Sequence, residues 1–214
     1  MADRTVITVD QTQGRKHEFM TSKGKSTRKK ILAESYKLFV KKGFKAVTMK
    51  DICEAAGLSR GGLYRYFSST GEIMTCLLGR EYPVAAQIRQ GVSARQIMEE
   101  QLAECRREML DNEISLSLAI YEFASVAPPH FFDEGNLKEK MRWSQLICYG
   151  IGTGEFRPVD ADQVADLIMY AYQGVRMWSR VIHMDSSITD HVLNSIREML
   201  YPERSDGKPL TNQD

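Results

Sequence analysis

Cysteine and histidine are too few and too scattered in this sequence to suggest a metal centre or a disulfide-stabilised fold. The four cysteines share no CxxC spacing, and the four histidines form no HExxH motif and do not stand beside an obvious nucleophile. Zinc sites and disulfide frameworks both depend on such spacings. We therefore expect no metal, no cofactor and no catalytic residues, and we expect the thiols to act as small apolar side chains.

Long apolar runs are missing as well. No stretch of about 18 apolar residues is present, so no membrane-spanning helix is expected. The polar N-terminal segment MADRTVITVDQTQGRKHEF lacks an apolar signal core, which predicts a cytoplasmic protein. By contrast, 43% of the 214 residues are hydrophobic, which is enough for a sizeable buried core.

The charges are distributed unevenly along the chain. Residues 1–70 contain 15 Lys and Arg against 6 Asp and Glu, whereas residues 71–214 contain 14 against 22. Such asymmetry predicts that one part of the chain meets a polyanion. A solvated basic face would explain the run KGKSTRKK at 23–30 taken alone, but this run adjoins a segment with independent signs of DNA binding.

Short helical segments follow one another closely after this basic run. An apolar stripe predicts a helix over residues 26–42, and Thr48-x-x-Asp51 has the pattern of a capping box that opens a second, short helix. Gly57 ends that helix, and Ser59 is a suitable N-cap for a third. Helix, short helix, tight turn and helix within about 45 residues is the order of a helix-turn-helix module.

Two adjacent glycines, Gly61 and Gly62, fall in the first turn of the third helix. A glycine in a helix costs about 1 kcal/mol relative to alanine, so the pair needs a reason. A flexible turn is one reason. The alternative that we favour is a bare helix N-terminus that lies close against DNA, with Arg60 and Arg65 beside it as candidate readers of guanine.

The candidate DNA-contacting residues come from this third helix, from the basic run and from the start of the second helix. They include tyrosines, whose hydroxyls can bind phosphate oxygens. They are Lys25, Arg28, Thr48, Lys50, Ser59, Arg60, Gly61, Gly62, Tyr64, Arg65, Tyr66 and Thr70.

The segment GFKAVTMKDICEAAGLSRGGLYRYFSS, residues 43–69, closely resembles the DNA-binding domain of TetR-family transcriptional regulators. The resemblance covers about 50 residues, and GEFRPVDADQVADLIMYAYQG at 154–174 is more weakly similar to the segment that leads into that family's dimerising helix. It implies a cytosolic bacterial homodimer that binds a palindromic operator in double-stranded DNA and holds a small-molecule inducer in a helical C-terminal domain.

Two positions depart from the family pattern. Gly62 stands where the family usually has Thr, Ser or Ala, and Thr70 stands where it commonly has a lysine. We expect one hydroxyl contact and one charged phosphate contact to be lost, and the basic residues before the module to compensate.

The remainder of the chain shows helical periodicity and no strand pattern. Helices are expected over 94–110, 114–126, from Asn136 to the glycines near 150, and over 160–184 and 187–200. The predicted fold is therefore all-α, with an N-terminal helix-turn-helix DNA-binding domain and a C-terminal helical ligand-binding and dimerisation domain. The predicted boundaries are a flexible arm over 1–21, the DNA-binding domain over 22–70, the C-terminal domain over 71–202 and a disordered tail over 203–214.

Two of these helices have further expected roles. Ser69-Thr70-Gly71-Glu72 has a second capping-box pattern, and it predicts a helix over about 69–88 that connects the domains and transmits movement. Helix 160–184 is apolar on more than one face, which suggests burial against its own domain on one side and a second subunit on the other. With helix 187–200 it would form a four-helix dimer bundle.

Composition alone guides the choice of ligand residues. The candidates are Phe123, Trp143, Tyr172, Gln173 and Arg176. Core packing explains most aromatic side chains equally well, and Arg176 has three alternatives: an acidic ligand, Glu122, or the dimer surface. The leading function is a repressor released from its operator by a small hydrophobic or aromatic ligand. A constitutive regulator, an activator and an enzyme with a DNA-binding appendage are the other classes considered.

Overall fold

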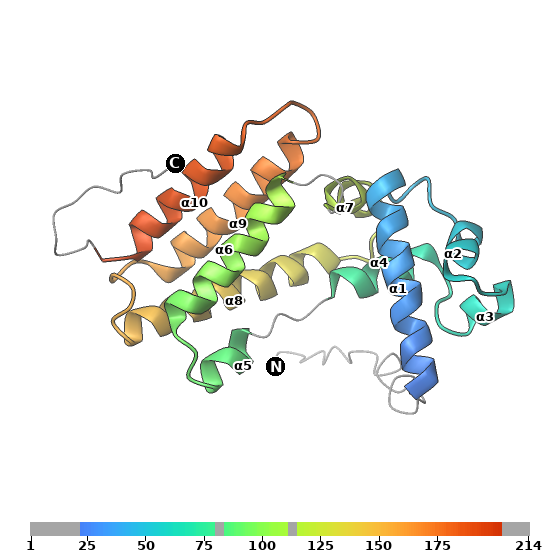
Figure 1. Ribbon diagram of the computed structural model, residues 1–214, viewed down its shortest axis with the longest axis horizontal. Helices are drawn as coiled ribbons and strands as arrows, with labels where there is room; N and C mark the ends of the chain where they lie inside the picture. Colours follow the sequence, from blue (N-terminus) through green and yellow to red (C-terminus); the bar gives the residue numbers. More distant parts are fainter. Residues whose placement is uncertain (1–21, 80–83, 111–114, 203–214) are drawn as a thin grey trace, which may run out of the picture.

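The structure is a computed structural model that describes residues 22–79, 84–110 and 115–202, and all regular secondary structure in these ranges is helical (Figure 1). The helices are α1 (Ser22–Lys42), α2 (Met49–Ala56), α3 (Arg60–Tyr64), α4 (Thr70–Leu78), α5 (Val84–Arg89), α6 (Ala94–Leu110), α7 (Ser117–Ala124), α8 (Phe131–Gly152), α9 (Ala161–Trp178) and α10 (Ser186–Leu200). The predicted all-α fold class is confirmed. The predicted arm and tail lie outside the described residues.

Local capping fixes where the N-terminal helices begin. The Thr48 side chain accepts a hydrogen bond from the Asp51 backbone N–H, and the Asp51 carboxylate accepts one from the Thr48 backbone N–H, as the capping-box pattern predicted. Hydrogen bonds from the Thr48 side chain and backbone hold the pKa of Asp51 well below its usual range. Gly57 ends α2 with φ +64°, a left-handed conformation that glycine adopts without steric cost.

The described helices bury two separate apolar cores. The first lies among α1, α2, α3, α4 and α7, and it includes Ile31, Phe39, Ile52, Leu63, Phe67, Ile73, Met74 and Phe123. The second lies among α5, α6, α8, α9 and α10, which form the other half of the molecule in Figure 1. The first core therefore continues past the predicted boundary at residue 70, because α4 and α7 supply part of its buried surface.

Several predicted helix boundaries are wrong. The single helix expected over 69–88 is two helices, because α4 ends at Leu78 with Gly79 as its C-cap and α5 begins at Val84. Glycine is a poor helix former, which agrees with the end of α4 at Gly79. The first helix starts at Ser22 rather than Ser26, and α9 ends at Trp178 rather than at residue 184.

Candidate nucleic-acid interface and ligand site

Helix α3 is short, and apolar side chains anchor it to the first core. Leu63 and Phe67 are 0% and 2% exposed, and both belong to the first core. Ser59 caps the helix, since its Oγ accepts a hydrogen bond of 3.2 Å from the backbone N–H of Gly62. The side of α3 away from these contacts carries the exposed Arg60 and Tyr64.

The two glycines of α3 have different surroundings. A Cβ added at Gly61 would meet no atom of the described residues within 4 Å, so no contact in this part of the chain requires glycine there. A Cβ at Gly62 would lie 3.2 Å from the Ser59 Oγ and would crowd the cap. Gly62 thus has a reason within the fold, whereas the bare surface at Gly61 is open to a partner outside it.

Most of the predicted DNA-contacting side chains are exposed in the structure. The exposed ones are Lys25, Thr48, Lys50, Ser59, Arg60, Gly61, Tyr64 and Arg65, and the partly buried ones are Arg28, Gly62, Tyr66 and Thr70. Tyr64 is a large aromatic residue that is 45% exposed. The exposed set spans α1, the start of α2 and the whole of α3, so it forms a surface around the helix-turn-helix.

Two basic residues of α1 have positions that the sequence did not reveal. The guanidinium of Arg28 turns toward the core, where Nη2 lies 2.6 Å from the Cys76 Sγ and the group stacks 5.1 Å from the Phe67 ring centroid. Lys30, which was not among the candidates, has its Nζ 3.7 Å from the place where a Gly57 Cβ would be. Lys30 therefore lies beside the turn that precedes α3. The sequence could have indicated Lys30 as a candidate, because it belongs to the basic run at 23–30.

The predicted ligand residues do not form one group. Phe123 lies in the first core, with its ring centroid 4.9 Å from Phe44 and 5.9 Å from Phe131. Trp143 belongs to the second core and is 3% exposed. Gln173 is exposed while Arg176 is buried, so their expected position on one common face is wrong: the three-residue step carries the chain from the solvent side of α9 to its inner side.

Arg176 makes its ion pair within the C-terminal half. Its Nη1 lies 3.0 Å from Oε2 of Glu108 on α6, not near Glu122, and it also contacts the Tyr172 hydroxyl. The Tyr172 hydroxyl in turn donates to Glu108, and burial raises the pKa of Tyr172, so the phenol stays protonated. Arg176 is only 5% exposed, and within the described ranges its buried Nε and Nη2 have no hydrogen-bond partner. Sequence reasoning selected Tyr172 and Arg176 but missed Glu108, which is 68 residues away in the chain.

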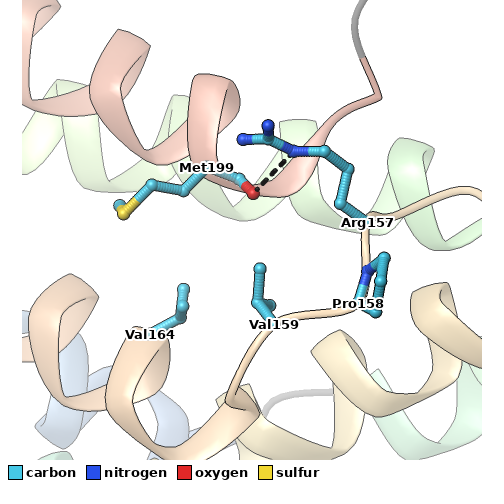
Figure 2. Close-up of a pocket in the computed structure, with 5 residues that line it drawn as sticks. All are labelled: Arg157, Pro158, Val159, Val164 and Met199. Atoms are coloured by element: carbon cyan, nitrogen blue, oxygen red, sulfur yellow. Dashed lines mark hydrogen bonds between the residues drawn. The ribbon is translucent and has the colours of Figure 1, made fainter.

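A surface groove lies elsewhere, at the end of α9 and α10 that is remote from α3. Figure 2 shows its lining residues, Arg157, Pro158, Val159, Val164 and Met199. The Arg157 Nε donates to the Met199 carbonyl oxygen at 3.2 Å, which ties the loop before α9 to the end of α10. None of the predicted ligand residues lines this groove.

The described residues contain no cluster of three or more His, Cys, Asp or Glu side chains arranged to hold a metal ion. All four cysteines are free thiols. Among the helices of the described ranges, none is both long and apolar enough to cross a membrane.

Comparison with known proteins agrees with this architecture. Residues 31–75 match the model of the family described as "Bacterial regulatory proteins, tetR family". The "Uncharacterized HTH-type transcriptional regulator YfiR" of Bacillus subtilis (strain 168) is 30% identical over 153 residues, which cover 65% of this chain and 73% of the relative. The "HTH-type transcriptional repressor KstR2" of Mycobacterium tuberculosis (strain ATCC 25618 / H37Rv) is 28% identical over 149 residues, which cover 65% of this chain and 74% of that protein.

Solved structures share the fold at lower identity. The structure described as "Molecular basis for control of antibiotic production by a bacterial hormones" superposes with a TM-score of 0.68 at 21% identity, covering 83% of this chain and 98% of the other. Reduced E. coli NemR superposes with a TM-score of 0.63 at 18% identity, covering 83% of this chain and all of NemR. With the helix-turn-helix geometry and the extent of the YfiR match, the chain belongs to the TetR family of bacterial regulatory proteins and is a DNA-binding transcriptional regulator rather than an enzyme.

Proposed function

We propose that this regulator is a repressor that binds a palindromic operator as a homodimer and leaves it when a small molecule binds the C-terminal half. The observation that carries the DNA-binding part is the open surface at Gly61 beside the exposed Arg60 and Arg65. A helix N-terminus without side chains can approach a phosphate closely, and arginine donates a bidentate pair to guanine O6 and N7. The repressor assignment is supported by the KstR2 relatives, which are named repressors.

A second subunit explains the outer side of α9. Leu167, Tyr170 and Trp178 on this helix are 47%, 61% and 58% exposed, and Ile188 on α10 is 40% exposed. Large apolar side chains along one helix that already buries its other side are typical of an interface between subunits. A two-fold dimer would present two copies of α3 to successive major grooves about 34–36 Å apart, which is the spacing that a palindromic operator requires.

Helix α7 provides a physical connection between the two halves. Arg180, just after α9, donates from Nη2 to the Ser115 carbonyl oxygen at 2.7 Å, and Ser115 stands just before α7. At the other end of α7, Glu122 Oε2 accepts a hydrogen bond of 2.8 Å from the Lys45 backbone N–H, in the loop that leads to α2. A ligand that moves α9 would displace α7, and through Glu122 it would shift the helix-turn-helix. This path takes the place of the unbroken helix over 69–88 that the sequence suggested.

Relatives of known structure support a small-molecule effector. One solved neighbour at 19% identity, with a TM-score of 0.58, is a putative transcriptional regulator from Saccharomonospora viridis in complex with choline. An effector can release DNA only if it binds the released conformation better than the DNA-bound one. Operator DNA must then weaken effector binding by the same factor.

The experiment is recovery of DNA from genomic fragments by the full-length protein, followed by affinity measurement on the recovered site. Arg60→Ala and Arg65→Ala are each expected to weaken binding by about 1–3 kcal/mol and to relax the preference at one base position of each half-site. Arg95→Ala, on the solvent side of α6, serves as the matched control that leaves DNA binding unchanged. Recovery of sites without two-fold symmetry would contradict the dimer, and activation of the adjacent gene by the bound protein would contradict the repressor assignment.

A further inference from the structure

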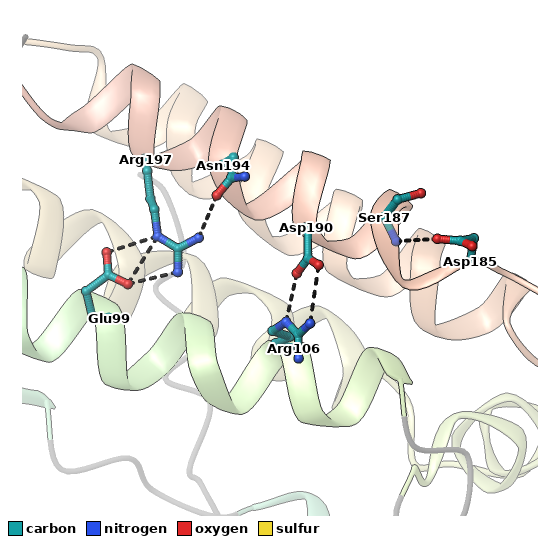
Figure 3. Close-up of polar contacts among 7 residues, drawn as sticks. All are labelled: Glu99, Arg106, Asp185, Ser187, Asp190, Asn194 and Arg197. Atoms are coloured by element: carbon teal, nitrogen blue, oxygen red, sulfur yellow. Dashed lines mark hydrogen bonds and ion pairs between the residues drawn. The ribbon is translucent and has the colours of Figure 1, made fainter. Parts of the chain in front are cut away.

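Arg176 differs from three other arginines that bind carboxylates in the described part of the chain, Arg106, Arg142 and Arg197. Arg106 and Arg197 on Figure 3 each direct the Nε and Nη2 edge of the guanidinium at a carboxylate, with Arg106 donating to Asp190 at 2.7 and 3.2 Å. Arg142 uses the same edge for both oxygens of Glu139. In all three cases the edge binds two oxygens of one side chain, which is the bidentate geometry that suits a planar carboxylate.

At Arg176 this edge has no hydrogen-bond partner among the described residues. Only Nη1 is used, by Glu108 and the Tyr172 hydroxyl, whereas Nε and Nη2 are buried and unpaired. A buried donor without an acceptor carries its full desolvation cost, and this cost is greater for a charged group. A fold that needed only the pair with Glu108 would gain stability from a shorter or apolar side chain at this position, so the retained edge points to an acceptor from outside the chain.

The surroundings define what can carry that acceptor. Met109 and Val175, which follow Glu108 and precede Arg176 in the chain, are 2% and 8% exposed and belong to the second core. Cys105, one turn before Glu108, is kept neutral because burial, followed by the negative charge of Glu108, raises the pKa of its thiol to about 12. Glu108 and Arg176 are therefore flanked along the chain by buried apolar residues of the second core, and the thiol one turn before Glu108 is neutral. Such a setting suits a ligand with a single charged end and an apolar body.

We propose that the effector of this regulator is an organic monocarboxylate, whose carboxylate binds the Nε and Nη2 edge of Arg176 while Nη1 stays paired with Glu108. This inference rests on the proposed function, and it names the ligand class of that regulator. Because Arg176 is 5% exposed, the ligand reaches it only in a conformation in which α9 and α6 have separated near Glu108. Binding therefore selects that conformation, and Arg180 transmits it to α7 through the Ser115 carbonyl oxygen.

The first test needs no DNA. The midpoint of thermal unfolding of the full-length protein is measured with hexanoate or 3-phenylpropionate and with the corresponding amides, at one ionic strength set with chloride, and titration calorimetry gives the Kd values. We expect both acids to raise the midpoint and the amides to leave it unchanged. Equal shifts for acids and amides, or no shift beyond that of chloride, would overturn the proposal.

Variants locate the effect. The double variant Arg176→Met with Glu108→Gln removes the cation and its buried partner together, so no unpaired charge remains. Its Kd for the acids should be about tenfold weaker or more, as expected for a lost charged hydrogen-bond pair. Arg106→Gln, whose edge is already bound to Asp190, is the matched control and should retain wild-type affinity. Undiminished acid binding by the double variant would overturn the assignment to Arg176, and binding of hexyl phosphate in place of hexanoate would overturn the carboxylate.

A second readout separates this proposal from the proposed function. DNA affinity is measured on the same samples with and without the acids. Acid binding through Arg176 that leaves DNA affinity unchanged supports the carboxylate site and contradicts ligand-driven release. Release of DNA by the amides and not by the acids supports ligand-driven release and overturns the carboxylate site.

Discussion

The two halves of this protein differ in how far apart in the sequence the partners of their main polar contacts lie. In the DNA-binding half, the caps of α2, α3 and α4 are made by side chains three residues away, as between Thr48 and Asp51. In the C-terminal half, the start of α6 is held by Glu155, which accepts hydrogen bonds from the backbone N–H groups of Ala94 and Arg95, 61 and 60 residues distant. Local caps also occur in this half: the Ser93 Oγ accepts from the Gln96 N–H at 3.4 Å before α6, and Asp160 and Asp185 cap α9 and α10. The packing of the helices against one another nevertheless depends on distant pairs.

Figure 3 shows how such distant pairs join α6 to α10. Arg197 binds Glu99 at 2.8 Å across 98 residues of sequence, and Arg106 binds Asp190 across 84. The helices that carry the proposed DNA-contacting surface are therefore capped within short segments of the chain. The inside of the C-terminal half is built from side chains that meet only after the chain has folded.

The largest effect is expected at the pair between Glu108 and Arg176. Glu108→Gln leaves the Arg176 cation buried without its counter-charge, since the side chains are 22% and 7% exposed. Breaking a buried pair is strongly destabilising, and because Glu108 is partly solvated we expect a loss of about 2–3 kcal/mol in the free energy of unfolding. Urea unfolding of the full-length protein measures this loss.

Two further variants sharpen this first prediction. Adding Arg176→Met to Glu108→Gln should recover most of the loss, because an apolar side chain replaces the unpaired charge. Asp190→Asn breaks an exposed pair with Arg106 and should cost about 1 kcal/mol or less. A Glu108→Gln variant as stable as Asp190→Asn would contradict the buried character of the distant contact.

The second prediction concerns Glu155 and acid. Burial raises the pKa of Glu155, but hydrogen bonds from the Ser93 side chain and from the backbone N–H groups of Arg95 and Ala94 together outweigh it and lower the pKa to about 2 from an ordinary 4.5. A carboxyl with a lowered folded pKa stabilises the fold above its unfolded pKa, and this stabilisation is lost as the pH falls from about 4.5 toward 2.

Glu155→Gln should remove that part of the pH dependence. At neutral pH we expect a loss of about 1–2 kcal/mol, since an anion at the N-terminus of α6 is replaced by a neutral amide. Urea unfolding at a series of pH values between about 2 and 7 measures both effects. Glu134→Gln, an exposed carboxylate on α8, is the control. An unchanged acid slope in Glu155→Gln would show that this distant cap does not hold α6.

The third prediction tests a local cap. Thr48→Ala removes the hydroxyl that accepts from the Asp51 N–H and should cost about 1 kcal/mol of stability. Thr27→Ala removes a hydroxyl that only donates back to the Lys23 carbonyl oxygen within α1, and it should cost almost nothing. Thermal unfolding of the two variants side by side provides the measurement, and equal midpoints would contradict the role of the capping box.

The same contrast explains what could be predicted from the sequence. The capping box at Thr48, the turn at Gly57 and the order of the first helices were predicted correctly, because each depends on residues within one or two turns of one another. The second box is half formed, since Ser69 caps α4 but the Glu72 carboxylate accepts from the Ser68 backbone N–H instead of that of Ser69. The sequence could not show that Phe123 would join the first core, since the contact with Phe44 crosses 79 residues and depends on where α7 docks. Nor could the sequence show that Glu108 pairs with Arg176, because the two residues lie 68 positions apart on different helices. The sequence analysis placed Gln173 on the same face of α9 as Arg176, because residues three apart often share a face. Here that face ends between them, so Gln173 is exposed and Arg176 is buried.

The smallest effect on stability is expected from a substitution at Gly61, on the exposed surface of α3. A Cβ there meets no atom within 4 Å, so Gly61→Leu should leave the fold intact and should raise stability slightly, by up to about 1 kcal/mol, because leucine is the better helix former. DNA binding should nevertheless be lost, because the leucine side chain would occupy the surface that we propose lies against the phosphate backbone.

Gly135→Leu on α8 is the matched control, since a Cβ at Gly135 also meets no atom within 4 Å. Thermal unfolding and affinity for the recovered operator are measured for both variants. Wild-type DNA affinity in Gly61→Leu would show that α3 does not approach DNA at this glycine. Equal loss of DNA affinity in both variants would show that the effect acts through the fold and not through the exposed surface of α3.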